Sequence, residues 1–221
     1  MCFGRSITSP TYYIGNQLIE QVNQVKDLGS TINSPFSHIH SICVTANRRL
    51  GMIKKAFISR DRNLLLTLYK HHVRPILEYG CVIWCPYTKK NIDSLERIQK
   101  RFCYLFKDLH NCDYRSKLKV LDLLSLSARR LRTKLLFLFK ILTNRTCLSP
   151  DDFFQPSNYR SNRGNSFKLR IPLSKHDYRS KFFTIDVLTH WNRLTDDDID
   201  VRSISAFKMS ILSYFKRHDI W

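Results

Sequence analysis

The residues most able to perform chemistry are two short runs of carboxylates, Asp151 with Asp152 and the three aspartates at 196–198. Phosphoryl transfer on nucleic acids uses two metal ions held by paired carboxylates on rigid elements. Both runs lie instead in polar, turn-rich sequence, where Asp commonly caps a helix or faces solvent. The chain also contains no P-loop, GxGxxG or GxSxG sequence. We therefore expect no catalytic residue and no cofactor in this chain.

The cysteines offer a second kind of chemistry, metal binding or disulfide formation. There are seven, an odd number, with no secretory leader before them, which predicts free thiols in a reducing, intracellular compartment. Zinc is the alternative, because His38, His40 and Cys43 are close in sequence and three residues separate Cys81 from Cys85. Neither spacing is that of a paired CxxC or C2H2 site, and the segment CVIWC is apolar. The pattern therefore favours buried thiols over a metal site.

Positive charge is concentrated in the middle of the chain. Residues 40–150 contain 23 Lys and Arg against 7 Asp and Glu, an excess of 16 within the net charge of +19. Such a field attracts a polyanion and exceeds what solubility needs. The partner that we expect is RNA, DNA or an RNA–DNA hybrid. No apolar run reaches 18 residues, so no membrane span is expected.

Two expected helices carry the clearest basic faces. The helix expected over 88–107 places cations and one tyrosine at i, i+3, i+4 and i+7, and the helix expected over 37–57 carries four cations beside its apolar stripe. The candidate nucleic-acid-binding residues are Arg48, Arg49, Lys54, Lys55, Arg97, Lys100, Arg101 and Tyr104. A solvated helix face is the alternative, which is weakened because only Asp93 and Glu96 are placed to pair with these cations.

A third group of cations opens the helix expected over 127–142, for which Ser127 is the expected cap. Arg129, Arg130, Arg132 and Lys134 all lie near its start. Each cation in a first turn opposes the helix macrodipole by about 0.3–1 kcal/mol. This arrangement favours an external phosphate as the compensating charge.

The overall pattern predicts a mainly α fold with a short N-terminal β-hairpin. The hairpin is expected over 12–32, with its turn at Gly15 and with Val22, Val25 and Leu28 packed on the first helix, since two strands alone are marginally stable. We divide the chain into residues 1–34, a thumb-like helical bundle at 35–110, and a helical C-terminal region at 111–221 with a polar loop near 149–175.

Within the bundle, a second helix is expected to start at the cap Asp61 and to kink or end at Pro75. Further helices are expected over 118–124, 176–194 and 204–215. The helices at 37–57 and 88–107 are expected to share one apolar core, so that their basic faces point outward.

Several short segments, in a fixed order, carry a family resemblance. They are VKDLGSTI at 25–32, ANRRLG at 46–51, RPILEYG at 74–80 with Trp84 and Pro86 after it, LERIQKR at 95–101, Arg129 and Arg130 before the run that ends KIL at 140–142, Arg160 and Arg163, KFF at 181–183 and WNRL at 191–194. Together they resemble the C-terminal part of the reverse transcriptases of non-LTR (LINE) retrotransposons, of the jockey/CR1-like kind. The resemblance covers nearly the whole chain.

The resemblance implies an RNA-directed DNA polymerase whose catalytic aspartates lie outside this chain. In the family the palm carries an aromatic-Ala-Asp-Asp turn that binds divalent metal, and this turn would lie upstream of Met1, together with the fingers. Residues 1–34 would then be the end of the palm, with Leu28 and Gly29 at the primer grip, and 35–110 the thumb. The chain alone is expected to be inactive and to hold template–primer nucleic acid through its backbone, without sequence preference.

Two other readings stay open. The first alternative is a domesticated, stand-alone RNA- or DNA-binding protein. The second is a pseudogene product without function. An in-frame palm upstream in the genome would favour a truncated reverse transcriptase over both.

Overall fold

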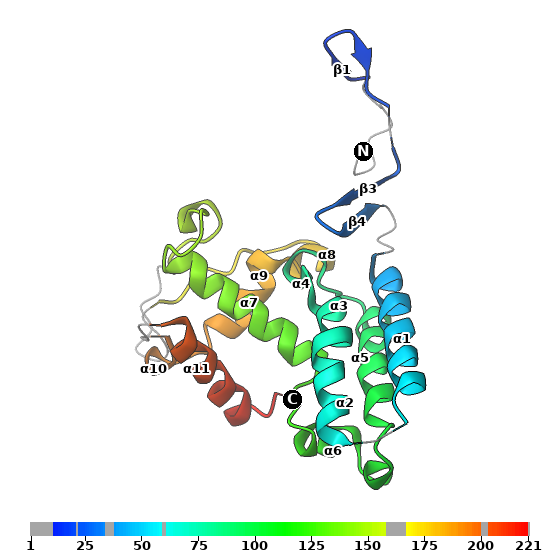
Figure 1. Ribbon diagram of the computed structural model, residues 1–221. Coiled ribbons are helices and arrows are strands. Elements are labelled where there is room, and N and C mark those ends of the chain that lie inside the picture. The colour runs from blue at the N-terminus through cyan, green and yellow to red at the C-terminus, as the bar shows by residue number, and fades with distance from the viewer. Residues whose placement is uncertain are drawn as a thin grey trace.

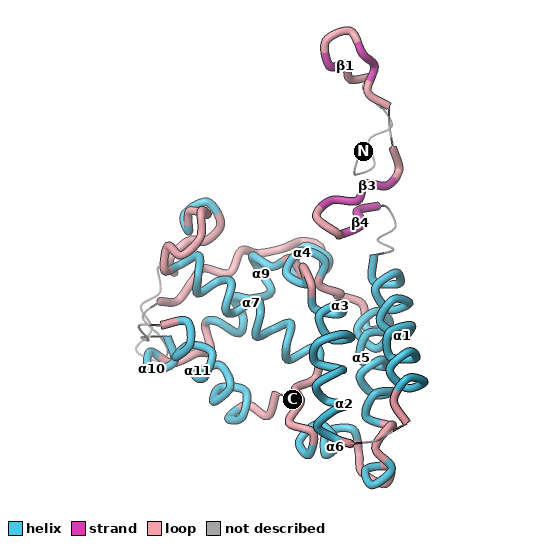
Figure 2. Tube along the Cα trace, in the orientation of Figure 1, coloured by secondary structure: helices cyan, strands magenta, loops and turns pink. Residues whose placement is uncertain are grey.

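The computed structural model describes residues 11–20, 22–33, 38–58, 61–157, 167–199 and 203–220. These residues form a mainly helical body, from which two short β-hairpins extend (Figure 1, Figure 2). The expected fold class is confirmed. The segment at 1–10, Arg160, Arg163 and the expected start of the first helix at 37 lie outside the described residues.

Two hairpins replace the single one expected over 12–32. β1 (Tyr13–Ile14) pairs with β2 (Gln17–Leu18), and β3 (Gln24–Asp27) pairs with β4 (Ser30–Asn33), both antiparallel. The first turn contains Gly15, as predicted. The second contains Leu28 and Gly29, with φ of 43° and 81°. A two-residue turn with positive φ at both positions matches strand twist, but the sequence does not signal it because a leucine seldom adopts positive φ.

The second helical stretch shows how the chain accommodates a proline. After α1 (His38–Ala56), α2 (Arg62–Leu68) begins at the predicted cap Asp61, whose carboxylate accepts the N–H of Leu64 at 2.7 Å. A π-turn (Tyr69–Val73) then leads into α3 (Arg74–Glu78), which has Pro75 near its start. Proline has no N–H and crowds the preceding turn, and the wider π-turn lets the helix pass this point without ending.

Local capping residues fix the next helices. α4 (Cys81–Trp84) precedes α5 (Lys89–Cys103), which starts where expected, with Thr88 as its cap. It ends before the expected residue 107, where a 3-10 turn (Lys107–Leu109) follows. α6 (Tyr114–Val120) starts earlier than expected because Asp113 caps it. α7 (Leu126–Leu142) is capped by Ser125, two residues before the expected Ser127.

The C-terminal region is helical in shorter pieces. A 3-10 turn (Pro150–Asp152) lies in the expected polar loop. The single helix expected over 176–194 is split into α8 (Asp177–Ser180) and α9 (Phe183–Trp191), because Phe182 adopts an extended backbone between them. α10 (Asp196–Ile199) and α11 (Ile204–Arg217) complete the described chain.

The helices bury two apolar clusters. The first runs from Ile39 to Leu126 and includes Tyr69 stacked on Phe102 at 4.2 Å between ring centroids. It contains the inward faces of both α1 and α5, so the expected shared core is confirmed. The second cluster runs from Ala128 to Phe215. α7 contacts α3, α4 and α5 on one side and α9 and α11 on the other, and it therefore connects the two clusters.

A buried polar network fixes α5 against the start of α7. The carboxylate of Glu96 accepts the Tyr114 hydroxyl and the backbone N–H of Leu126, the latter at 3.1 Å. Gln99 accepts the Tyr69 hydroxyl at 2.7 Å. Burial and the neighbouring Glu96 carboxylate raise the pKa of Tyr114 far above its usual range. Glu96 is therefore not a surface partner for the α5 cations. It also places a negative charge at the start of α7, and so supplies part of the charge compensation for the α7 cations that we expected from an external phosphate.

Candidate nucleic-acid interface

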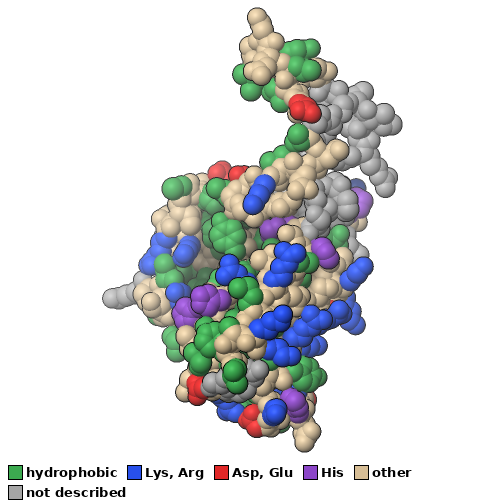
Figure 3. Space-filling view, turned by 45° about the vertical axis from the view of Figure 1, so that its right-hand side comes forward, with side chains coloured by type: hydrophobic (Ala, Val, Ile, Leu, Met, Phe, Trp, Pro, Cys, Tyr) green, Lys and Arg blue, Asp and Glu red, His purple; other side chains and the backbone are tan. Residues whose placement is uncertain are grey.

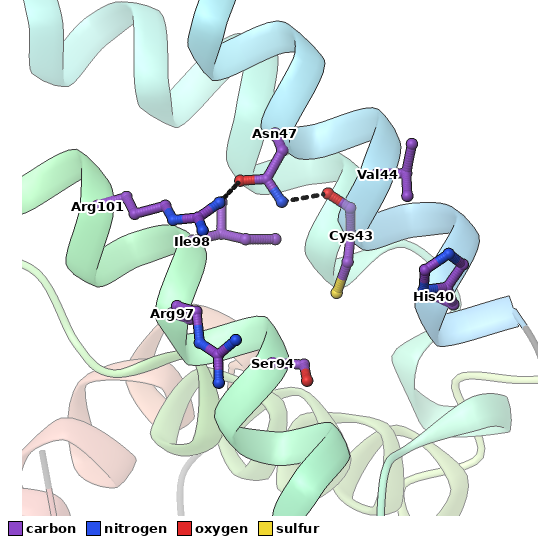
Figure 4. Close-up of a pocket in the computed structure, with 8 residues that line it drawn as sticks. All are labelled: His40, Cys43, Val44, Asn47, Ser94, Arg97, Ile98 and Arg101. Atoms are coloured by element: carbon purple, nitrogen blue, oxygen red, sulfur yellow. Dashed lines mark hydrogen bonds between the residues drawn. The ribbon is translucent and has the colours of Figure 1, made fainter.

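α1 and α5 lie side by side and run in the same direction (Figure 1). A hydrogen bond of 2.9 Å from Arg101 Nη1 to Asn47 Oδ1 joins them. Asn47 in turn donates from Nδ2 to the carbonyl oxygen of Cys43 at 2.9 Å, which fixes the orientation of its amide (Figure 4). The guanidinium of Arg101 is therefore held at the junction of the two helices.

A shallow groove of about 200 Å³ follows this junction. Its lining side chains come from both helices (Figure 4): His40, Cys43, Val44, Asn47, Ser94, Arg97, Ile98 and Arg101. None of these eight is acidic, and two are arginines one helical turn apart. The groove thus combines positive charge, hydrogen-bond donors and an apolar floor.

The four predicted residues of α5 do not all face the groove. Arg97 and Arg101 line it, whereas the ammonium of Lys100 lies 5.1 Å from the centroid of the Tyr114 ring, toward α6. The exposed face of α5 is therefore wider than the groove. It extends from the junction with α1 to the junction with α6.

Tyr104 closes this face at the C-terminal end of α5. Its side chain is 60% exposed, and the ammonium of Lys117 lies 4.2 Å from its ring centroid. Lys117 is buried, and its ammonium also donates to the carbonyl oxygen of His110. The His110 ring also lies near Tyr104, edge to face at 6.1 Å between ring centroids, and the exposed part of the Tyr104 ring is accessible to a stacked group. Sequence reasoning missed Lys117, because its contact with Tyr104 depends on how α6 folds back on α5.

The cations of α1 fall on three sides of that helix. Lys54 is two turns after Asn47 and so lies on the α5 side, and Lys55 and Arg48, also two turns apart, share the outer side. Arg49 is rotated about 100° from Arg48, away from α5. Figure 3 shows Lys and Arg side chains gathered on this flank of the helical body with few acids among them. Arg48, Lys54 and Lys55 extend the α5 face, and Arg49 does not.

The turn at Leu28 and Gly29 contacts Tyr79, the residue after α3, through its backbone. The Tyr79 hydroxyl donates to the carbonyl oxygen of Leu28 at 2.9 Å, and the N–H of Thr31 donates to His38 Nδ1 at 3.2 Å. The Leu28 side chain is 81% exposed, because it occupies the turn rather than a strand face.

The expectation that Val22, Val25 and Leu28 pack on the first helix is therefore wrong, since all three side chains are exposed. The strand that packs against α1 is β4. The hairpin is held by hydrogen bonds from its turn and from β4.

The two carboxylate runs have structural roles or face solvent. Asp151 and Asp152 are exposed in the 3-10 turn. Asp198 is buried and accepts the N–H of Thr195 at 3.0 Å, the reach-back contact that stabilises the start of α10. It also forms a salt bridge with Arg217 of α11. The expectation of capping or solvated acids is confirmed for these residues.

Across the described residues, no group of three or more His, Cys, Asp or Glu side chains is arranged to hold a metal ion. In the same residues, no helix has the length and apolar character that a bilayer crossing requires. No protein-family model, curated protein or solved structure matches the chain at a significant level.

Proposed function

We propose that this chain binds the phosphate backbone of nucleic acid along the exposed faces of α1 and α5, as the thumb-like C-terminal part of a reverse transcriptase related to those of non-LTR retrotransposons. The observation that carries the proposal is the groove between α1 and α5, whose lining includes Arg97, Arg101, His40 and Asn47 and contains no acidic side chain. The ordered segments that resemble the family support the same assignment.

The chemistry of the groove suits phosphate rather than base edges. A guanidinium presents a planar fork of donors that matches phosphate oxygens. Arg101 is already oriented by Asn47, so part of the ordering cost is met before the ligand binds. Contacts to phosphates position a duplex but carry no sequence information. The preferred duplex is an RNA–DNA hybrid, whose A-like shape suits recognition through the backbone.

The assignment is tested with a substituted α5 face. Arg97→Gln with Lys100→Gln and Arg101→Gln removes three charges and keeps polar side chains of similar length. Lys181→Gln with Lys208→Gln and Lys216→Gln removes the same charge from exposed C-terminal positions. Arg217 is left unchanged in this control because it pairs with Asp198.

Affinity is measured by fluorescence anisotropy with two RNA–DNA hybrids of unrelated sequence. We expect the α5 triple variant to bind both hybrids about ten- to a hundred-fold more weakly, and the control to change little. Equal losses from the two variants would mean that only total charge matters. A loss confined to one hybrid would contradict binding through phosphates.

A further inference from the structure

A second cluster of arginines lies between α3 and α7, apart from the groove. Arg129 of α7 holds Glu78 of α3 with two hydrogen bonds, one from Nε to Oε1 and one of 2.9 Å from Nη2 to Oε2. Arg74, one turn before Glu78, has its Nε 3.9 Å from the same Oε1. The side chains of Arg74, Glu78 and Arg129 are each about one-fifth exposed, so the cluster is sheltered but open to solvent.

This cluster contains more positive charge than its single carboxylate can balance. Arg132 lies one turn after Arg129, and its Nε is buried without a hydrogen-bond partner among the described residues. Burial first, and then the charge of Arg129, lower the pKa of both Arg74 and Arg132. Burial lowers the pKa of Arg129 as well, but its hydrogen bonds to Glu78 outweigh this effect and raise the pKa overall. Arg74 and Arg129 therefore share the Glu78 carboxylate, and together with Arg132 one turn along α7 the three guanidinium groups exceed it by two positive charges.

The cluster and the groove lie on opposite faces of the helical bundle. α1 contacts α5 and α3, and α7 contacts the same two helices from the other side (Figure 1). The junction of α1 with α5 is therefore diagonally opposite the junction of α3 with α7. A ligand in one junction leaves the other open.

We propose that Arg74, Arg129 and Arg132 form a second phosphate-binding site, so that one copy of the chain holds two nucleic-acid segments, one on each face of the bundle. The pairing with Glu78 fixes the guanidinium of Arg129. Arg74 and Arg132 provide N–H groups that can donate hydrogen bonds to the oxygens of a phosphodiester. The phosphate also supplies the negative charge that the cluster lacks. This inference rests on the proposed function, because the first segment occupies the α1–α5 face.

A bridging experiment tests the inference. One RNA–DNA hybrid is immobilised, the full chain is added, and capture of a second, fluorescent hybrid of unrelated sequence is measured. Light scattering under the same conditions reports whether the protein is monomeric. The test variant is Arg74→Gln with Arg132→Gln, which keeps the pair between Arg129 and Glu78, and Arg132→Gln alone serves if the double variant does not fold. The matched control is Lys181→Gln with Lys208→Gln.

We expect monomeric wild-type protein and the control to capture the second hybrid. The test variant is expected to bind the immobilised hybrid within two-fold of wild type and to capture at least five-fold less of the second. Bridging by the test variant at the wild-type level would overturn the second site and leave the proposed function intact. No binding of the immobilised hybrid by wild type would instead overturn the proposed function.

Inorganic phosphate separates a nucleic-acid site from a site for a free anion. Thermal unfolding is compared in phosphate and chloride at equal ionic strength. If phosphate stabilises wild type but not the test variant, and wild type nevertheless fails to bridge two hybrids, the cluster binds only a free anion and the inference is wrong. Stabilisation together with bridging supports it.

Discussion

Arg101 and Asn47 join the two basic helices of this protein through a hydrogen bond of 2.9 Å from the guanidinium to the side-chain amide. The bond holds a cation at the centre of a groove that has no acidic lining residue. Because Asn47 is neutral, it orients Arg101 without neutralising it. The charge of Arg101 therefore remains available to a ligand.

Substitution of Asn47 tests this relationship. In Asn47→Asp a carboxylate competes with phosphate for the same guanidinium, and we expect the affinity for an RNA–DNA hybrid to fall about five-fold. In Asn47→Ala the orienting bond is lost but the charge stays free, so the loss is expected to be smaller. Fluorescence anisotropy measures both. Equal losses would show that Arg101 makes no phosphate contact.

Tyr104 is expected to stack on an unpaired base through the ring face opposite Lys117. Base–aromatic stacking contributes about 1–3 kcal/mol per base, so Tyr104→Ala should weaken binding of single-stranded RNA by about ten-fold. Tyr104→Phe keeps the ring and should stay within two-fold of wild type. Tyr87→Ala, at another exposed tyrosine, is the control. If Tyr104→Ala binds as tightly as this control, Tyr104 has no stacking role.

Glu96 is expected to matter for stability. Its removal leaves the N–H of Leu126 and the hydroxyl of Tyr114 without their buried acceptor. We expect Glu96→Ala to lower the free energy of unfolding by about 2–3 kcal/mol, measured by urea denaturation. Asp93→Ala, an exposed acid on the same helix, should change it by less than about 0.5 kcal/mol. A similar effect of the two substitutions would contradict the buried network.

The contact between β4 and α1 is expected to depend on pH. Burial lowers the pKa of His38 below its usual value of 6.5, and its neutral Nδ1 accepts the N–H of Thr31. Because the folded pKa lies below the unfolded one, the stabilisation is fully present above pH 6.5 and is lost as the pH falls through the folded pKa.

Hydrogen exchange of the Thr31 amide, corrected for its intrinsic rate, measures this effect. Protection should be lower at pH 5 than at pH 7.5. The Ala128 amide, which Ser125 caps with a hydroxyl that does not titrate, should show no such loss. Equal behaviour of the two amides would argue against a role for His38.

Local signals in the sequence predicted much of the fold. Examples are the cap Asp61, the start of α5 near Thr88 and the apolar stripes of α1 and α5. These patterns depend on residues a few positions apart and can be read directly. The second hairpin turn escaped prediction because Leu28 adopts a backbone conformation that its residue type disfavours.

The candidate site was predicted less completely, because several of its contacts join residues far apart in the chain. Arg97 and Arg101 were placed on a basic face from spacing alone. The bond between Arg101 and Asn47, and the position of Lys117 against Tyr104, depend on how helices pack. Glu96 was expected at the surface, yet it is buried because α7 starts directly against α5.

The most direct test of the central claim is the salt dependence of hybrid binding by the α5 triple variant, Arg97→Gln with Lys100→Gln and Arg101→Gln. Each lost phosphate contact flattens the slope of log affinity against log salt concentration by about one unit. We expect this variant to flatten the wild-type slope by about two to three units. The triple control at Lys181, Lys208 and Lys216 should change it by less than about one unit. A slope that stays at the wild-type value in the α5 variant, or that falls equally in both variants, would contradict a phosphate-binding surface on α1 and α5.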